Sequence, residues 1–233
     1  MNKNNIIKIS LITALSISAY AADNHVELSF VQSSGNTEST TFSGKVQTAI
    51  NLTAVDIVKA KATVLYSKAD GDTDANKYTL ELDYNRMLNK NLYTFLSADY
   101  VNDEFSDYDY RINIGPGLGY KILDNDIHKL DAQLAAVYAF DKFEDSSKEE
   151  YVAAKPEVNY RYNIQSNIQF NQMVNYLQSL KDSGTYFAAS ESSLSLKVME
   201  NLSMALTYRL DYTNETSEDK WDKKFLTSVI YDF

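Results

Sequence analysis

The sequence predicts an all-β fold: a single antiparallel up-and-down transmembrane β-barrel of about 12 strands. Three observations carry this prediction. Apolar and polar residues alternate with period two along nearly all of residues 22–233, the alternating segments run to about ten residues, and tyrosines gather near both segment ends. Strands of that length, tilted in a bilayer, cover an apolar band of about 25 Å, whereas soluble strands usually have about five or six residues.

Residues 1–21 have the organisation of a signal peptide. Lys3 and Lys8 give a basic start, residues 6–19 form an apolar stretch, and Ala19-Tyr20-Ala21 supplies the small-x-small pattern of a cleavage site. The apolar stretch is short for a transmembrane helix, which needs roughly 20 residues. We therefore expect cleavage before residue 22, and we expect any insertion of the mature chain into a membrane to use strands.

The alternation assigns two faces to each predicted strand. In residues 78–86 (YTLELDYNR), tyrosines and leucines occupy one face, while threonine, glutamate, aspartate and asparagine occupy the other. We expect the apolar faces to contact lipid and to be free of charged side chains. The same pattern predicts strands at 26–33, 40–52, 57–66, 78–86, 92–100, 108–121, 129–140, 151–162, 167–176, 185–198, 202–212 and 224–233.

Aromatic residues are expected to form two girdles, because the amphipathic tyrosine ring prefers a membrane interface. The chain has 18 Tyr and 10 Phe but a single Trp. One set falls at one end of the predicted strands: Tyr66, Tyr78, Tyr100, Tyr110, Tyr138, Tyr176, Tyr186 and Tyr212. The other set falls at the opposite end: Tyr84, Tyr120, Tyr160, Tyr162, Tyr231 and Phe233.

The predicted connections alternate in length. Short ones follow the even-numbered segments, at residues 53–56, 88–91, 163–166 and 199–201. Longer, acidic ones follow the odd-numbered segments, at residues 67–77, 101–107, 141–150, 177–184 and 213–223. Outer-membrane barrels have short turns on the periplasmic side and longer loops outside, so we expect both termini on the periplasmic side.

A glycine run, Gly115-Pro116-Gly117-Leu118-Gly119, lies inside one alternating segment. Because no helix pattern follows it, a phosphate-binding loop is not favoured. We expect the three glycines to point inward and to leave room for neighbouring side chains, while Pro116 removes one ladder bond and bends the strand. Pro156 is expected to mark a similar irregularity.

Composition excludes several classes of function. A net charge of −10 argues against nucleic-acid binding, and the absence of cysteine excludes disulfides, thiol nucleophiles and thiolate metal sites. His25 and His128 fall at the predicted periplasmic rim, where we interpret them as solvated turn residues rather than catalytic groups. We expect neither an enzyme nor a cofactor.

One acidic segment has the spacing of a calcium-binding loop. Residues 70–76 (DGDTDAN) match D-x-D-x-D-x-N, and Glu81 stands at the twelfth position. However, Ala75 occupies the place where the sharp turn needs glycine, and Glu81 belongs to a predicted strand. A solvated acidic outer loop is therefore favoured over a metal site.

Three stretches resemble the family of salt-induced outer membrane proteins, whose function is unknown. They are Ser34-Gly35-Asn36-Thr37, residues 114–120 (IGPGLGY) and the closing Tyr231-Asp232-Phe233. The resemblance covers residues 26–233 and implies a barrel in the bacterial outer membrane, in contact with lipid and lipopolysaccharide. It offers no catalytic residues. The final strand, ending in aromatic-x-aromatic at Phe233, resembles the signal that such barrels present to the barrel-assembly machinery.

The polar faces predict a lumen with charges of both signs. We expect Lys59 and Lys61 near Glu81 and Asp83, Asp99 near Arg111, Lys197 near Arg209 and Asp211, and Lys224 near Glu27. Two functions remain open: a small pore for ions or small polar solutes, and a non-conducting structural or surface-interaction barrel. The charged residues predicted to line the lumen are Lys45, Lys59, Lys61, Glu81, Asp83, Asp99, Arg111, Lys155, Glu157, Arg161, Lys197, Arg209 and Asp211.

Overall fold

The computed structural model describes residues 22–33, 39–217 and 219–233 of the chain. The predicted signal peptide and the Ser34-Gly35-Asn36-Thr37 stretch lie outside these residues. No helix in the described part of the chain is long and apolar enough to cross a membrane. The described residues form the strands β1 (Ala22–Ser33), β2 (Ser39–Asn51), β3 (Asp56–Ala69), β4 (Asp72–Met87), β5 (Leu92–Asp103), β6 (Tyr108–Asp124), β7 (His128–Phe143), β8 (Lys148–Gln165), β9 (Ile168–Ser179), β10 (Tyr186–Lys197), β11 (Leu202–Thr213) and β12 (Trp221–Asp232).

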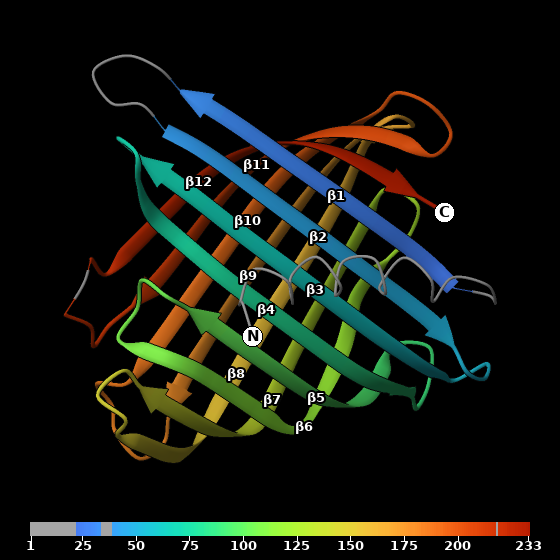
Figure 1. Cartoon of the computed structure of the whole chain (residues 1–233). Helices are drawn as coiled ribbons and strands as arrows, with labels where there is room; N and C mark the ends of the chain where they lie inside the picture. Colours follow the sequence, from blue (N-terminus) through green and yellow to red (C-terminus); the bar gives the residue numbers. More distant parts are fainter. Residues whose placement is uncertain (1–21, 34–38, 218) are drawn as a thin grey trace.

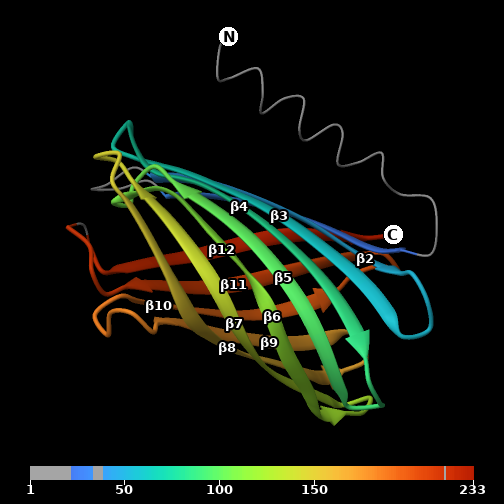
Figure 2. The ribbon, with the colours of Figure 1, turned by 90° about the horizontal axis from the view of Figure 1, so that it is seen from below.

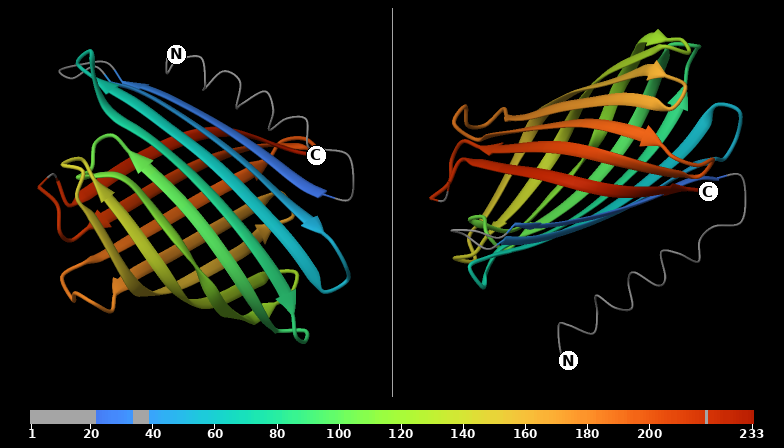
Figure 3. Two further views of the ribbon diagram at one scale, coloured as in Figure 1. Left: turned by 60° about the horizontal axis from the view of Figure 1, so that its bottom comes forward. Right: turned by 90° about the horizontal axis from the view of Figure 1, so that it is seen from above.

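These strands close into one antiparallel barrel, which confirms the predicted fold. Each strand pairs with its neighbours in sequence, and β1 pairs with β12 to complete the wall. Figure 1 shows β1–β4 crossing at a steep angle in front of the strands on the far side, as strands tilted around a barrel must. Figures 2 and 3 show the same wall from below and from two further directions.

The barrel has two distinct ends. At one end, which we call the terminus end, lie Ala22, Phe233 and the connections 52–55, 88–91, 125–127, 166–167 and 198–201. At the other, the loop end, the described connections are 70–71, 104–107, 144–147, 180–185 and, between β11 and β12, residues 214–217 and 219–220. The prediction of long loops is wrong for the first of these, because strand pairing continues beyond the aromatic girdle.

The predicted loop 67–77 is instead a tight hairpin. Pairing between β3 and β4 continues as far as Ala69 and Asp72, with a bulge at Ser67/Lys68. The turn itself consists of Asp70 and Gly71, with φ of 51° and 91°, a left-handed conformation that glycine adopts without steric cost. Asp72, Asp74 and Asn76 therefore follow one another along a strand and do not wrap around a calcium ion. The described residues contain no group of three or more His, Asp or Glu suited to a metal.

The outer face of the barrel is apolar over its middle. Leu28, Leu82, Ile114, Leu134 and Val229 are all about half exposed, and they come from five different strands. Large apolar side chains exposed over a whole surface indicate contact with lipid or with partners. Near the loop end, aromatic rings contact one another from strand to strand across β9–β12, with centroids 4.7–5.8 Å apart: Tyr176, Tyr186, Tyr212 and Trp221.

The prediction that the outer face is free of charged side chains is wrong at one position. Arg86, the last residue of the predicted segment 78–86, lies on the same face as Leu82 and Tyr84. Its Nη1 is 3.3 Å from Oδ1 of Asp56, which also accepts a hydrogen bond of 2.6 Å from the Tyr84 hydroxyl. This cluster sits at the terminus end of the strands, where a membrane interface tolerates charge.

A small packed core occupies one side of the barrel interior. It contains Tyr93, Phe95, Val137, Tyr151 and Leu177, with Phe187 against it. The glycines of β6 make room for it, as predicted. A Cβ on Gly117 would lie 2.2 Å from the Phe95 ring, and one on Gly119 would lie 2.1 Å from the Tyr93 ring.

Both prolines interrupt the ladder as predicted. The pairing of β6 with β7 skips Gly115 and Pro116, and the pairing of β8 with β9 skips Lys155 and Pro156. Each proline lacks the backbone N–H that a ladder bond needs.

Candidate functional site

A water-accessible space, the vestibule, fills the terminus half of the lumen. It consists of a cavity of about 970 Å³ and an adjoining one of about 890 Å³, which share Lys59, Lys61 and Arg161 in their lining. The lining begins beside the terminus-end turns, at Asn167 and Asp124. It ends in mid-barrel at the residues of a charged network.

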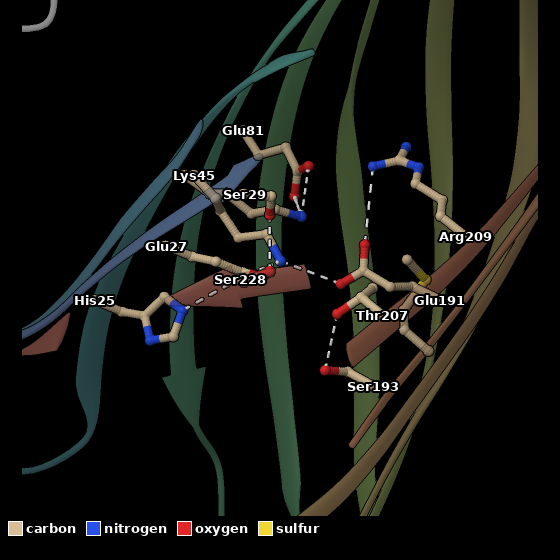
Figure 4. A network of polar contacts seen from close by, with 12 residues as sticks. His25, Glu27, Ser29, Lys45, Glu81, Glu191, Ser193, Thr207, Arg209 and Ser228 are labelled. Atoms are coloured by element: carbon tan, nitrogen blue, oxygen red, sulfur yellow. Dashed lines mark hydrogen bonds and ion pairs between the residues drawn. The ribbon is translucent and has the colours of Figure 1, made fainter. Parts of the chain in front are cut away.

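This network crosses the lumen and closes the vestibule on the side that faces the loop end. Lys45 on β2 lies 2.9 Å from Glu27 on β1 and 3.1 Å from Glu191 on β10, three strands away from β1 around the wall (Figure 4). Arg209 on β11 lies 3.9 Å from Glu191 and 3.0 Å from Asp211. The side chains are mostly buried, with exposed fractions between 8% and 23%.

Lys77 extends the network to a nearly opposite wall. Its Nζ on β4 lies 3.7 Å from Asp211 on β11 and 3.2 Å from Asp103 on β5. Acids and bases thus alternate along one continuous path, which we call the charge chain: Glu27, Lys45, Glu191, Arg209, Asp211, Lys77 and Asp103. Because each charged group has a neighbour of opposite charge, the charge chain links the strands without producing a strong net electrostatic field.

A second set of contacts narrows the loop half of the lumen. The Arg111 guanidinium on β6 lies 3.4 Å from the centre of the Phe187 ring on β10, on the far side of the interior. Its Nε donates to Asp141 at 2.6 Å, and the Tyr151 hydroxyl donates to the same carboxylate at 2.8 Å. Asp141 is fully buried. The Arg111–Asp141 pair, the Tyr151 hydroxyl and the Phe187 ring together link β6, β7, β8 and β10.

Three of the predicted charge pairings are wrong. Arg111 pairs with Asp141, while Asp99 pairs with Lys155 across the interior at 2.5 Å. Lys197 lies opposite Ser203, at the terminus end and away from Arg209. Lys224 pairs with Asp222 on its own strand, because the β1–β12 register places Glu27 opposite Ile230.

The other predicted lumen charges lie on inward faces near the vestibule. Lys61 contacts Glu81 at 2.9 Å, and Lys59 stands opposite Asp83 in the ladder. Glu157 accepts a hydrogen bond of 2.6 Å from Asn159. All of these residues line one or both cavities, together with Arg161, Lys197 and Lys155.

Sequence reasoning missed three residues of these networks: Lys77, Asp103 and Asp141. All three fall in predicted loops, yet each keeps the inward parity of its strand. Lys77 and Asp141 lie two residues beyond the nearest predicted inward position, and Asp103 lies four residues beyond it. Continuing the alternation past the tyrosines would have found them.

We had expected the two histidines to be solvated turn residues, but both make specific contacts. His25 Nδ1 lies 2.7 Å from Asp232 Oδ1, which joins β1 to β12 at the terminus end. His128 Nδ1 lies 2.9 Å from the Tyr160 hydroxyl, and its ring stacks on Tyr162. Both therefore have defined structural partners at the rim.

A contact between connections spans the loop end. The backbone N–H of Ser217 donates to Asp107 Oδ2 at 2.8 Å, and the Ser217 hydroxyl donates to the other carboxylate oxygen. Burial alone would raise the pKa of Asp107, but these hydrogen bonds and one with Thr216 hold it below its usual value. This contact, which we call the loop-end latch, joins the connection 104–107 to residues 214–217.

Comparison with known families gives one match, over residues 26–233, to a family described as protein of unknown function, DUF481. The chain belongs to the DUF481 family. No curated protein sequence matches this DUF481 chain.

The DUF481 barrel is similar in fold to solved structures of outer-membrane proteins. The NanC porin has a TM-score of 0.56 at 9% identity, over 91% of this chain and 98% of that one. The COG4313 outer membrane channel from Pseudomonas putida F1 has a TM-score of 0.58 at 11% identity, over 94% and 97%. The translocator domain of autotransporter NalP from Neisseria meningitidis has a TM-score of 0.52 at 9% identity, over 99% and 95%. At these identities the likeness shows the fold alone.

Proposed function

We propose that the protein is an integral outer-membrane β-barrel that forms a narrow pore for ions or small polar solutes. The vestibule, continuous with a polar interior and closed in mid-barrel by side chains rather than backbone, is the observation that carries this proposal. Side chains can rearrange within a rigid barrel wall, so a solute can pass where ion pairs exchange partners.

The location in the bacterial outer membrane is supported by the outer face. Exposed leucines, isoleucines and valines surround the barrel, and aromatic side chains contact one another near the strand ends. Lipid contacts this apolar outer face, and lipopolysaccharide contacts the loop end. The barrel-assembly machinery recognises the strand that ends at Phe233. The resemblance to salt-induced outer membrane proteins adds the proposal that cells produce more of this protein at high salt.

The charge chain supports weak ion selectivity. It alternates acids and bases, so an entering ion of either sign meets a partner of opposite charge. The links across the lumen, Lys45–Glu191 and Lys77–Asp211, are expected to set the conductance. Removing both side chains of one of these ion pairs leaves the net charge unchanged and should widen the lumen.

Single-channel recording in planar bilayers tests this function. We expect small, weakly selective conductance from the refolded chain, and an increase of about twofold or more in the double variant Lys45→Ser/Glu191→Ser. The matched control, Lys181→Ser/Glu149→Ser, removes an exposed ion pair at the loop-end rim and should leave conductance unchanged. Absence of conductance in all three proteins would favour the non-conducting structural barrel instead.

A further inference from the structure

One wall of the vestibule, formed by β8, β9 and β10, is built mainly from amides and hydroxyls. Asn163, Gln169 and Asn171 face the cavity together with Ser193 and Ser195. Two glutamates on these strands line the vestibule, and both are already engaged: Glu191 by Lys45 at 3.1 Å, and Glu157 by Asn159 at 2.6 Å. The wall therefore presents neutral hydrogen-bonding groups.

The amides are oriented by a directional chain of hydrogen bonds. Arg161 Nε donates to Asn171 at 3.2 Å, Asn171 donates to Gln169 at 3.1 Å, and Gln169 donates to Asn163 at 2.9 Å. Asn163 in turn donates to the backbone carbonyl of Asp126 at 2.6 Å. Because arginine can only donate, the direction of the whole chain is fixed.

Each amide in this chain keeps spare capacity. A carboxamide has two N–H donors and two lone pairs, and the chain uses one of each. Asn163, Gln169 and Asn171 are partly exposed, so one N–H and one lone pair of each are available to a ligand. A hydroxyl group both donates and accepts, which makes a polyhydroxylated molecule the complementary partner.

Two cations flank the amides without a carboxylate partner. Arg161 and Lys197 are exposed to the vestibule and form no ion pair with any described residue. The terminal nitrogens of Arg161, which the chain of amides does not use, present the fork that binds a carboxylate or phosphate.

We propose that this wall, which we call the amide wall (Arg161, Asn163, Gln169, Asn171 and Lys197), binds a small polyhydroxylated anion, a sugar acid or a sugar phosphate. The amides bind the hydroxyls and the two cations bind the acidic group. This inference deepens the proposed function by naming the solute class that would enter the pore, but binding itself does not require conduction.

Binding is measured by saturation-transfer NMR on the full barrel in lipid nanodiscs. The probes are gluconate, glucose 6-phosphate, glucose and propionate. Gluconate and glucose 6-phosphate should bind more tightly than glucose, which lacks the charge, and gluconate more tightly than propionate, which lacks the hydroxyls. Preference for glucose 6-phosphate over gluconate would assign the acidic group as phosphate, and the reverse order would assign it as carboxylate.

Variants separate the two halves of the site. Arg161→Gln should weaken gluconate binding about tenfold, the loss of one charge-assisted hydrogen bond. Gln169→Ala should weaken gluconate roughly fivefold and leave propionate unchanged, because only hydroxyls use that amide. The matched control Lys90→Gln removes a lysine from the turn 88–91 and should change neither affinity.

Equal affinity for gluconate, glucose and propionate, or unchanged gluconate binding in Arg161→Gln and Lys197→Gln, would overturn this proposal. Heat-dependent gel migration verifies that each variant is folded. Binding without conductance would contradict only the pore, and conductance without binding would contradict only the amide wall.

Discussion

At the scale of single residues, the packed side of the interior depends on glycines at positions where a Cβ would collide with a buried ring. Gly117 and Gly119 lie under the Phe95 and Tyr93 rings, which are buried against β6. The alternation along β6 was enough to predict that these glycines point inward. The rings that cover them could not be named, because that requires the register between β5 and β6.

Gly117→Ala should lower the free energy of unfolding by about 1–3 kcal/mol, because the new methyl group collides with the Phe95 ring. Urea titration of the barrel in detergent or lipid measures this change. Gly44→Ala is the matched control, since its Cβ would lie 3.2 Å from a Val64 methyl group on the outer face. Equal losses for the two variants would contradict the packing described here, as would failure of Phe95→Leu to recover part of the loss.

At the scale of elements, alternation located the strands well and their ends poorly. β4 and β5 extend beyond their predicted segments, to Asp72 and Asp103, and carry Lys77 and Asp103 into the lumen. Acidic residues beyond a tyrosine girdle look like loop residues in the sequence, although backbone pairing continues through them. The tight turn at Asp70–Gly71 was missed for this reason.

Ion pairs across the lumen were beyond prediction for a different reason. Pairs between adjacent strands, such as Lys61–Glu81, follow from parity and an approximate register. Lys45–Glu191 and Lys77–Asp211 join strands that are far apart around the wall. Their formation depends on the width of the closed barrel, which no local pattern encodes.

The loop-end latch is expected to open in acid. The folded pKa of Asp107 is held below its usual value, so the latch is complete above the usual aspartate pKa of about 3.9 and is lost as pH falls through the folded value. Spin labels at Phe105→Cys and Lys220→Cys, in a chain with no native cysteine, report the distance between the two connections.

We expect a narrow distance distribution at neutral pH and a broad one in acid. Asp107→Asn should broaden the distribution at both pH values, because an amide cannot replace the charged acceptor. The control Asp145→Asn, in the neighbouring connection 144–147, should not affect it. An unchanged distribution in Asp107→Asn would show that other contacts hold these connections together.

At the scale of the whole molecule, the barrel combines three environments in one closed sheet. The outer face is apolar, one side of the interior is packed like a protein core, and the rest holds a polar vestibule below the charge chain. Strand parity separates the outer face from the interior. The division within the interior depends on barrel closure, which brings Phe187 against Arg111 and Glu191 against Lys45.

The lumen is open at the terminus end and closed in mid-barrel, inside a wall that spans the membrane. Single cysteines at Ser195, which lines the vestibule, and at its outward neighbour Leu194 test it most directly. A charged, water-soluble thiol reagent is added to either side of liposomes that contain the barrel in one orientation. We expect rapid labelling of Ser195→Cys from the terminus side, labelling at least about tenfold slower from the loop side, and no labelling of Leu194→Cys. Equal labelling of Ser195→Cys from both sides, or ready labelling of Leu194→Cys, would contradict it.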